Sequence, residues 1–287
     1  MNIFFSEQWG KIWENIYNGI WETYYTDNPY IVHVYIKKPI YINDILHYEL
    51  ISPYYVNGFY YNNNVSNDDI QSFLMNFKKH CIDNNYISEF VRFTPHIPII
   101  NIFHTFYSIE LVSKYYYIDL TKGYDYYINN AESRHRCCVK HYPSNYIFNL
   151  NTNPSYDDYI HFMEMYNQHM KNIHAKDFYI FPESFYKNLL NINCILAHIL
   201  CDNNIISSSI FIEDNKYIYY FLSCKNNSYK KTHNIVIDKI IQYGISNNLE
   251  KLILGGGITP NDSLDVFKRS ITKLYHPYYI GKCNFNV

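Results

Sequence analysis

Hydrophobic side chains recur at every third or fourth position in several stretches of the chain. The first such stretch begins after Ser6 and includes Trp9, Ile12, Trp13, Ile16 and Ile20. Two later stretches each follow an S-x-x-D pair, Ser66 with Asp69 and Ser155 with Asp158. Such a pair satisfies backbone N–H groups at the start of a helix, so the spacing predicts helices at all three places. The repeated S-x-x-D pair indicates that the second half of the chain begins the same order of helices and strands as the first half.

Runs rich in β-branched and aromatic residues, separated by Asn, Asp and Gly, predict the strands. In the first half we expect strands at 30–36, 47–51, 87–93 and 108–120, and a polar helix at 124–135. In the second half we expect strands at 194–200, 205–212, 216–223, 251–254 and 274–280, with helices after Pro182 and at 232–246 and 262–269. Three antiparallel strands would therefore lead into a helix and then into a strand parallel to the third.

Composition narrows the classes of protein that this chain can be. Hydrophobic residues make up 48% of the 287 residues, which is enough for a sizeable core. A net charge of −2 lacks the basic field of typical nucleic-acid binders, so we expect no DNA partner. The seven Cys have no zinc-like spacing and are expected to be free thiols, with no metal bound. The chain has no signal-peptide pattern and no apolar run of about 18 residues, so we expect a cytoplasmic protein without a membrane span.

Four segments resemble the FemAB-like branch of the acetyltransferase (GNAT) superfamily. These are the strand Glu89–Pro95 with its R-F-x-P pattern, the Y-I-D-L of Tyr117–Leu120, the aromatic helix of Phe162–Lys176, and the segment from Leu254 to Lys268. The last segment reads L-G-G-G, then D-S-L-x-x-F-K, and is the most specific of the four.

The resemblance implies an α/β fold of the α+β type, with two tandem GNAT-like domains and mixed, mostly antiparallel sheets. We place a degenerate N-terminal domain at 1–145 and the C-terminal acyltransferase domain at 146–287. In such a fold the acyl donor enters where the third and fourth strands of a domain separate, here 216–223 and 251–254.

The resemblance also implies transfer of an acyl group to an amine, which requires a stabilised oxyanion and two well-oriented reactants. Tyr220 and Lys268 match family positions that would meet the oxyanion or the leaving group, although a buried structural Tyr or a solvated Lys would give the same pattern. Asp119 is our first candidate for the general base, ahead of Glu183, His169 and His174.

The acyl donor is expected to be acetyl-CoA or another acyl-CoA, bound before and at the start of the helix at 232–246. A helix N-terminus offers free amides to a phosphate. The candidate cofactor-binding residues are Ser223, Lys230, Lys231, Thr232 and Asn234. The loop at 228–234 contains no Gly, which departs from the usual pyrophosphate loop of coenzyme-A-dependent acetyltransferases.

The acceptor is expected to contact residues of the matching motifs. The candidates are Arg92, Tyr179, Gly255, Gly256, Gly257, Asp262 and Arg269. Glycines let a ligand approach the backbone closely, and Asp262 is placed to cap the following helix.

Three functions follow from these observations. The first is an acyl-CoA-dependent N-acyltransferase that acts on an amino sugar or nucleotide-linked amino sugar of a surface glycan. The second is a FemX-like aminoacyltransferase that uses aminoacyl-tRNA to build peptidoglycan bridges, although no helical arm is visible in the sequence. The third is a catalytically inactive binding protein, which the altered loop would suit. The acceptor and the oligomeric state stay open.

Overall fold

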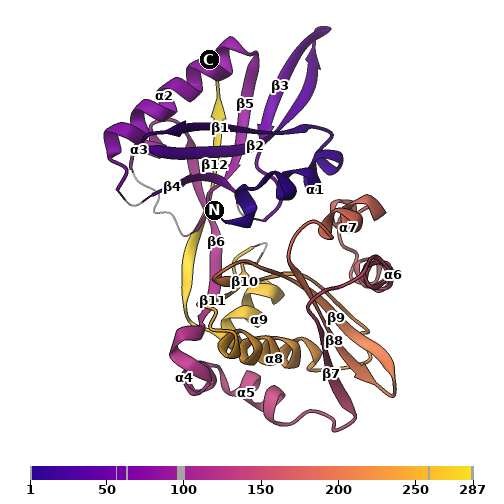
Figure 1. Ribbon diagram of the computed structural model, residues 1–287. Coiled ribbons are helices and arrows are strands. Elements are labelled where there is room, and N and C mark those ends of the chain that lie inside the picture. The colour runs from indigo at the N-terminus through magenta and orange to yellow at the C-terminus, as the bar shows by residue number, and fades with distance from the viewer. Residues whose placement is uncertain (1, 56, 63, 96–100, 258, 286–287) are drawn as a thin grey trace. The chain divides into compact units, whose positions relative to one another are not determined.

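The computed structural model describes residues 2–55, 57–62, 64–95, 101–257 and 259–285, and the chain forms two compact units. Unit 1 comprises Met1–Ser113 together with His276–Val287, and unit 2 comprises Lys114–Tyr275. Figure 1 labels the helices and strands of both units.

Unit 1 carries the first elements of the chain. In order they are η1 (Ile3–Phe5), α1 (Glu7–Tyr17), β1 (Ile20–Asp27), β2 (Tyr30–Ile42), β3 (Ile45–Ile51), β4 (Gly58–Tyr61), α2 (Asn67–Asp83), β5 (Tyr86–Arg92) and α3 (Asn101–His104). Two further strands, β6 (Ser108–Asp119) and β12 (Tyr275–Asn284), each contribute residues to both units.

Unit 2 carries the remaining elements. They are η2 (Leu120–Lys122), α4 (Gly123–Asn130), α5 (Ser133–Lys140), β7 (Tyr146–Asn151), α6 (Tyr156–Asn172), η3 (Asp177–Tyr179), α7 (Glu183–Leu189), β8 (Cys194–Cys201), β9 (Asn204–Glu213), β10 (Tyr217–Lys225), α8 (Thr232–Ser246), β11 (Lys251–Gly255) and α9 (Ser263–Ile271).

Both units share one strand pattern. In unit 1 the strands run in the order β1-β2-β3-β5-β12, and in unit 2 in the order β7-β8-β9-β10-β11-β6. Neighbouring strands are antiparallel except for one pair in each unit, β3 with β5 and β10 with β11. A helix, α2 or α8, connects the two strands of each parallel pair. The predicted fold, two tandem GNAT-like units with mixed and mostly antiparallel sheets, is confirmed.

The last strand of each sheet comes from a distant part of the chain. β5 pairs with the end of β12 through Ile280 to Asn284, and β11 pairs with the end of β6 through Tyr116 to Asp119. The boundaries between the two compact units therefore fall after Ser113 and after Tyr275. The sequence had suggested a single boundary, after residue 145. Hydrogen bonds between strands more than 130 residues apart leave no local pattern from which this exchange could be predicted.

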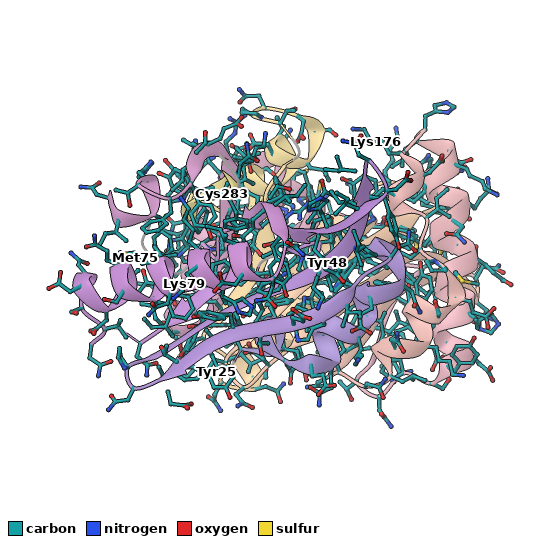
Figure 2. The ribbon with its side chains drawn as sticks, turned by 90° about the horizontal axis from the view of Figure 1, so that it is seen from above. Tyr25, Tyr48, Met75, Lys79, Lys176 and Cys283 are labelled. Atoms are coloured by element: carbon teal, nitrogen blue, oxygen red, sulfur yellow. The ribbon has the colours of Figure 1, made fainter. Side chains whose placement is uncertain are left out.

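Side chains at the helix starts explain where α2 and α6 begin. Ser66 accepts the N–H of Asp69, and the Asp69 carboxylate accepts the N–H of Ser66 in return. Ser155 and Asp158 form the same reciprocal box at α6. Figure 2 labels Met75 and Lys79 on α2, whose opposite side buries Ile70, Phe73, Leu74, Phe77 and Cys81.

In unit 2, helices cover both faces of the sheet (Figure 1). The buried side of α8 packs in one core with Ile195, Ala197 and Ile199 of β8. Side chains of a strand alternate between faces, so Cys194, Leu196 and His198 lie on the other face. That face carries α6, whose Tyr159 hydroxyl hydrogen-bonds with Cys194.

Several elements differ from the sequence prediction, and among them strand β4 was not predicted. Asn18 adopts a left-handed conformation that ends α1, so Ile20 begins a strand and is 58% exposed. The helix expected at 124–135 is broken at Ala131, whose extended backbone separates α4 from α5. Strand β7 was not predicted, because Asn149 and Asn151 interrupt its apolar pattern.

Candidate functional site

The parallel ladder between β10 and β11 is short. Its register pairs Tyr217 with Lys251 and ends with Tyr219 opposite Ile253. Among the described residues, β10 continues to Lys225 paired with β9 alone, and the pairing shifts between Tyr220 and Leu222. The two strands thus separate where the acyl donor was expected. Beyond Ile253 the backbone of β11 no longer pairs with β10, while Gly255 still pairs with Tyr116 of β6.

Glycines follow this opening directly. Gly255 has a φ of 72°, a conformation that a side chain would strain. A Cβ on Gly257 would lie 2.5 Å from the Asp262 carboxylate, so this position admits glycine alone without displacing Asp262. Asp262 accepts the N–H of Asp265 at 2.7 Å and that of Thr259 at 3.0 Å, which starts α9 and holds the loop against it.

Lys268 is the buried cation of this site. It is 7% exposed, and its ammonium donates to the Gly256 carbonyl at 2.5 Å. Burial lowers its pKa to about 8, and the nearby charges of Asp262 and Asp265 oppose part of that shift. Lys268 is therefore mainly protonated at pH 7, next to the released backbone of the glycine segment.

The carboxylate of Asp265 connects α9 to β6. It is buried, accepts the Tyr116 hydroxyl at 3.0 Å and lies 3.9 Å from the Arg269 guanidinium. Arg269 also donates to the Asn261 side chain at 3.1 Å. These contacts fix the orientation of α9 and therefore the direction in which Lys268 points.

Tyr220 belongs to a hydrogen-bonded cluster on the neighbouring strands. Ser223 Oγ lies 2.8 Å from Ser209 Oγ and 2.9 Å from His233 Nε2. Burial raises the pKa of Tyr220 to about 12, while hydrogen bonds from Ser223 and Ser209 oppose that rise. Burial lowers the pKa of His233 to about 3. Tyr220 thus keeps its proton, and His233 stays neutral, throughout the physiological range.

The start of α8 is held by α5. Lys231, at the N-cap, has a left-handed backbone, makes no side-chain cap and donates its ammonium to the His141 carbonyl. Asn234 Oδ1 lies 2.8 Å from His135 Nδ1. Thr232 is 1% exposed, and within the described part of the chain its hydroxyl has no partner. Lys230 is exposed.

The structure brings most of the predicted site residues into two neighbouring sets. One contains Gly255 to Gly257, Asp262, Lys268 and Arg269, and the other contains Tyr220, Ser223 and Thr232 with the adjoining loop. The rings of His233 and Phe267 connect the two sets, with centroids 6.3 Å apart.

Three further predicted residues have other surroundings in the structure. Asp119 caps η2 and pairs with Lys251 at the start of β11, about 13 Å from Gly255 at ~3.3 Å per residue. Tyr179 lies in η3, between α6 and α7. Arg92 belongs to unit 1, where it donates to the Ser52 carbonyl at 2.5 Å.

Two residues of the site were not predicted. Asp265 follows the cap residue Asp262 by three positions, a spacing that could have marked it as part of the helix start. His233 gave no signal, because its position beside Ser223 depends on how α8 packs against β10. Among the described residues there is no group of three or more His, Cys, Asp or Glu side chains that could hold a metal, and no helix is long and apolar enough to span a membrane.

Comparison with known proteins establishes the fold. No family model and no curated protein sequence matches the chain. Among solved structures it is similar to FemX, with a TM-score of 0.72, 9% identity, and coverage of 100% of this chain and 92% of that one. It also resembles the C-terminal domain of a putative lysylphosphatidylglycerol synthetase from Agrobacterium fabrum, with a TM-score of 0.66, 10% identity and coverage of 96% and 87%.

A tandem GNAT protein of the clavulanic acid biosynthesis pathway is a third likeness, with a TM-score of 0.53, 6% identity and coverage of 90% and 83%. At these identities the likeness concerns the fold. The protein has the FemAB-like, GNAT-type fold that the motif around Gly255 and Lys268 suggested.

Proposed function

We propose that this protein is an N-acyltransferase, and that it transfers an acyl group from acyl-CoA to the amine of an amino sugar or nucleotide-linked amino sugar. One observation carries the proposal: the β10–β11 ladder opens at Ile253, and the buried ammonium of Lys268 lies beside the glycines that follow. A released strand edge next to a desolvated cation suits a carbonyl that becomes an oxyanion.

In the proposed reaction the neutral amine attacks the carbonyl carbon of the thioester, and negative charge develops on the carbonyl oxygen. Lys268 supplies positive charge to that oxygen while its contact with Gly256 holds it in place. The C–S bond then breaks, the leaving thiolate takes a proton from a donor side chain, and the proton that the amine loses replaces it on that donor. Tyr220 is the candidate proton donor, because its pKa of about 12 keeps it protonated.

A second candidate donor is aminoacyl-tRNA, and a specific observation favours it. Lys231 and Asn234 were both expected to contact coenzyme A. Instead, Lys231 donates to the carbonyl of His141 at the end of α5, and Asn234 hydrogen-bonds with His135 of α5. The start of α8 then offers a pyrophosphate its backbone N–H groups and the exposed Lys230, without the side chains of Lys231 and Asn234. The chemistry at Lys268 would be the same, because an ester carbonyl passes through the same oxyanion.

Donor binding distinguishes these candidates. We expect acetyl-CoA to bind in calorimetry and to donate its acyl group to a hexosamine panel. Binding of charged tRNA instead, with a steep dependence on salt, would favour the second donor. If neither donor binds, the proposed activity is wrong.

A substitution tests the role of Lys268 once a substrate is found. Lys268→Met keeps most of the side-chain volume and removes the charge. Loss of one charge-assisted contact of roughly 1.5–3 kcal/mol should lower turnover about ten- to a hundredfold. Lys187→Met, on the exposed side of α7, is the matched control and should retain full turnover. Full activity of Lys268→Met would assign Lys268 a structural role only.

A further inference from the structure

A groove on unit 2 lies apart from the β10–β11 opening, on the sheet face that carries α6. It has a volume of about 460 Å³, within the ~300–1,000 Å³ of small-molecule sites. The strands that line it are β7, β8 and the start of β9 at Ile205, and β10 lies on the other side of β9 in the sheet. Its polar lining consists of Asn149, Asn151, Thr152, Asn153, Asp158 and His198.

The Asp158 carboxylate uses one of its two oxygens for the fold. Oδ2 accepts the N–H and the hydroxyl of Ser155, both at 2.8 Å, and the side-chain amide of Asn151 at 3.1 Å. Among the described residues, no donor contacts Oδ1. Asn151 is fixed in turn, because its own oxygen accepts the N–H of Asn153 at 3.0 Å. The groove therefore has a rigid polar wall with one acceptor left for a ligand.

His198 is a second polar side chain of the groove that has no fixed partner among the described residues. Its ring forms no hydrogen bond with any residue in the described ranges, and its Nδ1 is buried. Burial lowers its pKa, which keeps the imidazole neutral, and Asp158 opposes that shift from nearby. Asn149 is exposed beside it, directly opposite His198 in the β7–β8 ladder. Together these side chains offer both donors and acceptors.

The charge of the groove limits what it can bind. Hydrogen bonds from Ser155 lower the pKa of Asp158, so this carboxylate is ionised at neutral pH. None of the lining residues is Lys or Arg, which disfavours a phosphate, sulfate or carboxylate ligand. Leu200 and Ile205 form an apolar part of the wall, against which the C–H face of a ring can pack.

We propose that this groove is a binding site for a neutral saccharide unit. Asp158 Oδ1 and the Asn149 amide would bind neighbouring hydroxyls, His198 would bind a third, and Leu200 with Ile205 would contact the apolar face of the sugar ring. The site takes no part in acyl transfer, so its test requires no activity and its failure would leave the proposed function untouched.

Titration of the full chain followed by NMR tests the proposal. The probes are a neutral hexose and an N-acetylhexosamine, with sulfate and tetramethylammonium as the anionic and cationic comparisons, each at millimolar concentration. We expect a saccharide to shift the side-chain amides of Asn149 and Asn151 and the ring protons of His198. No shift with either saccharide, or stronger binding of sulfate or tetramethylammonium, would overturn the proposal.

Three variants locate the binding. Asn149→Ala should weaken saccharide binding about two- to tenfold, the value of one neutral hydrogen bond. Ile205→Trp should fill the groove and abolish binding. Leu190→Trp, which adds an exposed indole at the end of α7, is the control and should bind as the parent does. Unchanged binding by Ile205→Trp would place the saccharide elsewhere and contradict the proposal.

Discussion

The two parallel strand pairs of this protein begin alike and end differently. In unit 1 the pairing of β3 with β5 continues past the strands, because Ser52 donates to the Phe90 carbonyl at 2.8 Å and Asn57 bridges to Phe93. In unit 2 the pairing of β10 with β11 stops at Ile253 and a glycine segment follows. The same connection therefore gives a closed edge in one unit and an open one in the other.

The helices that lie between the two strands of each parallel pair, α2 and α8, differ in the same way. The α2 N-terminus is satisfied by Ser66 and Asp69 of its own chain segment, and Asp68 adds a second negative charge. The α8 N-terminus has no side-chain cap, and Thr232 there lacks a partner within the described residues.

The two units also differ in how their buried ionisable side chains are paired. In unit 1, Glu89 is bonded to His33 and accepts the Tyr107 hydroxyl at 2.7 Å, which satisfies both carboxylate oxygens inside the core. In unit 2, Lys268 has a carbonyl partner and two carboxylates nearby, and it lies next to an opening. Under the proposed function, we therefore expect unit 1 to matter mainly for stability and the chemistry to lie in unit 2.

The largest effect is expected from Glu89→Ala. Removing the shared acceptor leaves His33 and Tyr107 buried without it, which should lower the free energy of unfolding by about 2–5 kcal/mol. Chemical denaturation measures this, with Glu89→Gln as the milder control. If unit 1 is structural, turnover per folded molecule should not change. A selective loss of turnover in a stable Glu89→Ala protein would break the comparison.

Lys268 should make stability depend on pH. Its pKa is about 8 in the fold, against ~10.4 in the unfolded chain. Between these values the unfolded chain binds more protons, so stability should rise with pH by up to about 3 kcal/mol relative to Lys268→Met. Urea unfolding of both proteins from pH 7 to pH 10 measures the difference. Parallel curves for the two proteins would show that Lys268 keeps an ordinary pKa.

Gly257→Ala should act on the site through the cap of α9. The new Cβ would displace the Asp262 carboxylate, and loss of that cap should cost about 1 kcal/mol and reduce turnover by disturbing Lys268. Gly123→Ala is the control, because Gly123 has a φ of 76° but open space around it. Its backbone strain of roughly 1–3 kcal/mol should lower stability and leave turnover per folded molecule unchanged. Equal turnover in the two variants would show that the glycine segment is not part of the site.

The smallest effects compare the two capping boxes. Ser66→Ala and Ser155→Ala each remove one cap, and each should lower stability by about 1 kcal/mol. Ser→Thr at the same positions should recover most of that loss. Denaturant curves measure all four variants. If only one of the two Ser→Ala variants lost stability, the two S-x-x-D pairs would not be equivalent helix caps.

Much of the site around α9 could be predicted from the sequence, because its residues lie within one short segment. Gly257, Asp262 and Lys268 are close in the chain, and the cap that Asp262 forms with Asp265 fixes the start of α9, which carries Lys268. The pairing of Ser223 with His233 could not be predicted in this way. It depends on the packing of α8 against the sheet, which no local pattern records.

The sequence by itself determined most helices and strands, since these follow from periodicity and from side chains that bond within a few residues. The tandem fold followed from the order of these elements together with the family resemblance. Tertiary structure decided that β12 pairs with β5 of unit 1 and that β6 pairs with β11 of unit 2. It also decided that the β10–β11 ladder ends at Ile253 and that residues at α5 bond to the start of α8. It also placed Asp119 at the far end of β11 from Gly255. The physical reason is the same in each case: backbone hydrogen bonds and desolvation act between segments distant in sequence, and any residue that fits the register satisfies them equally well.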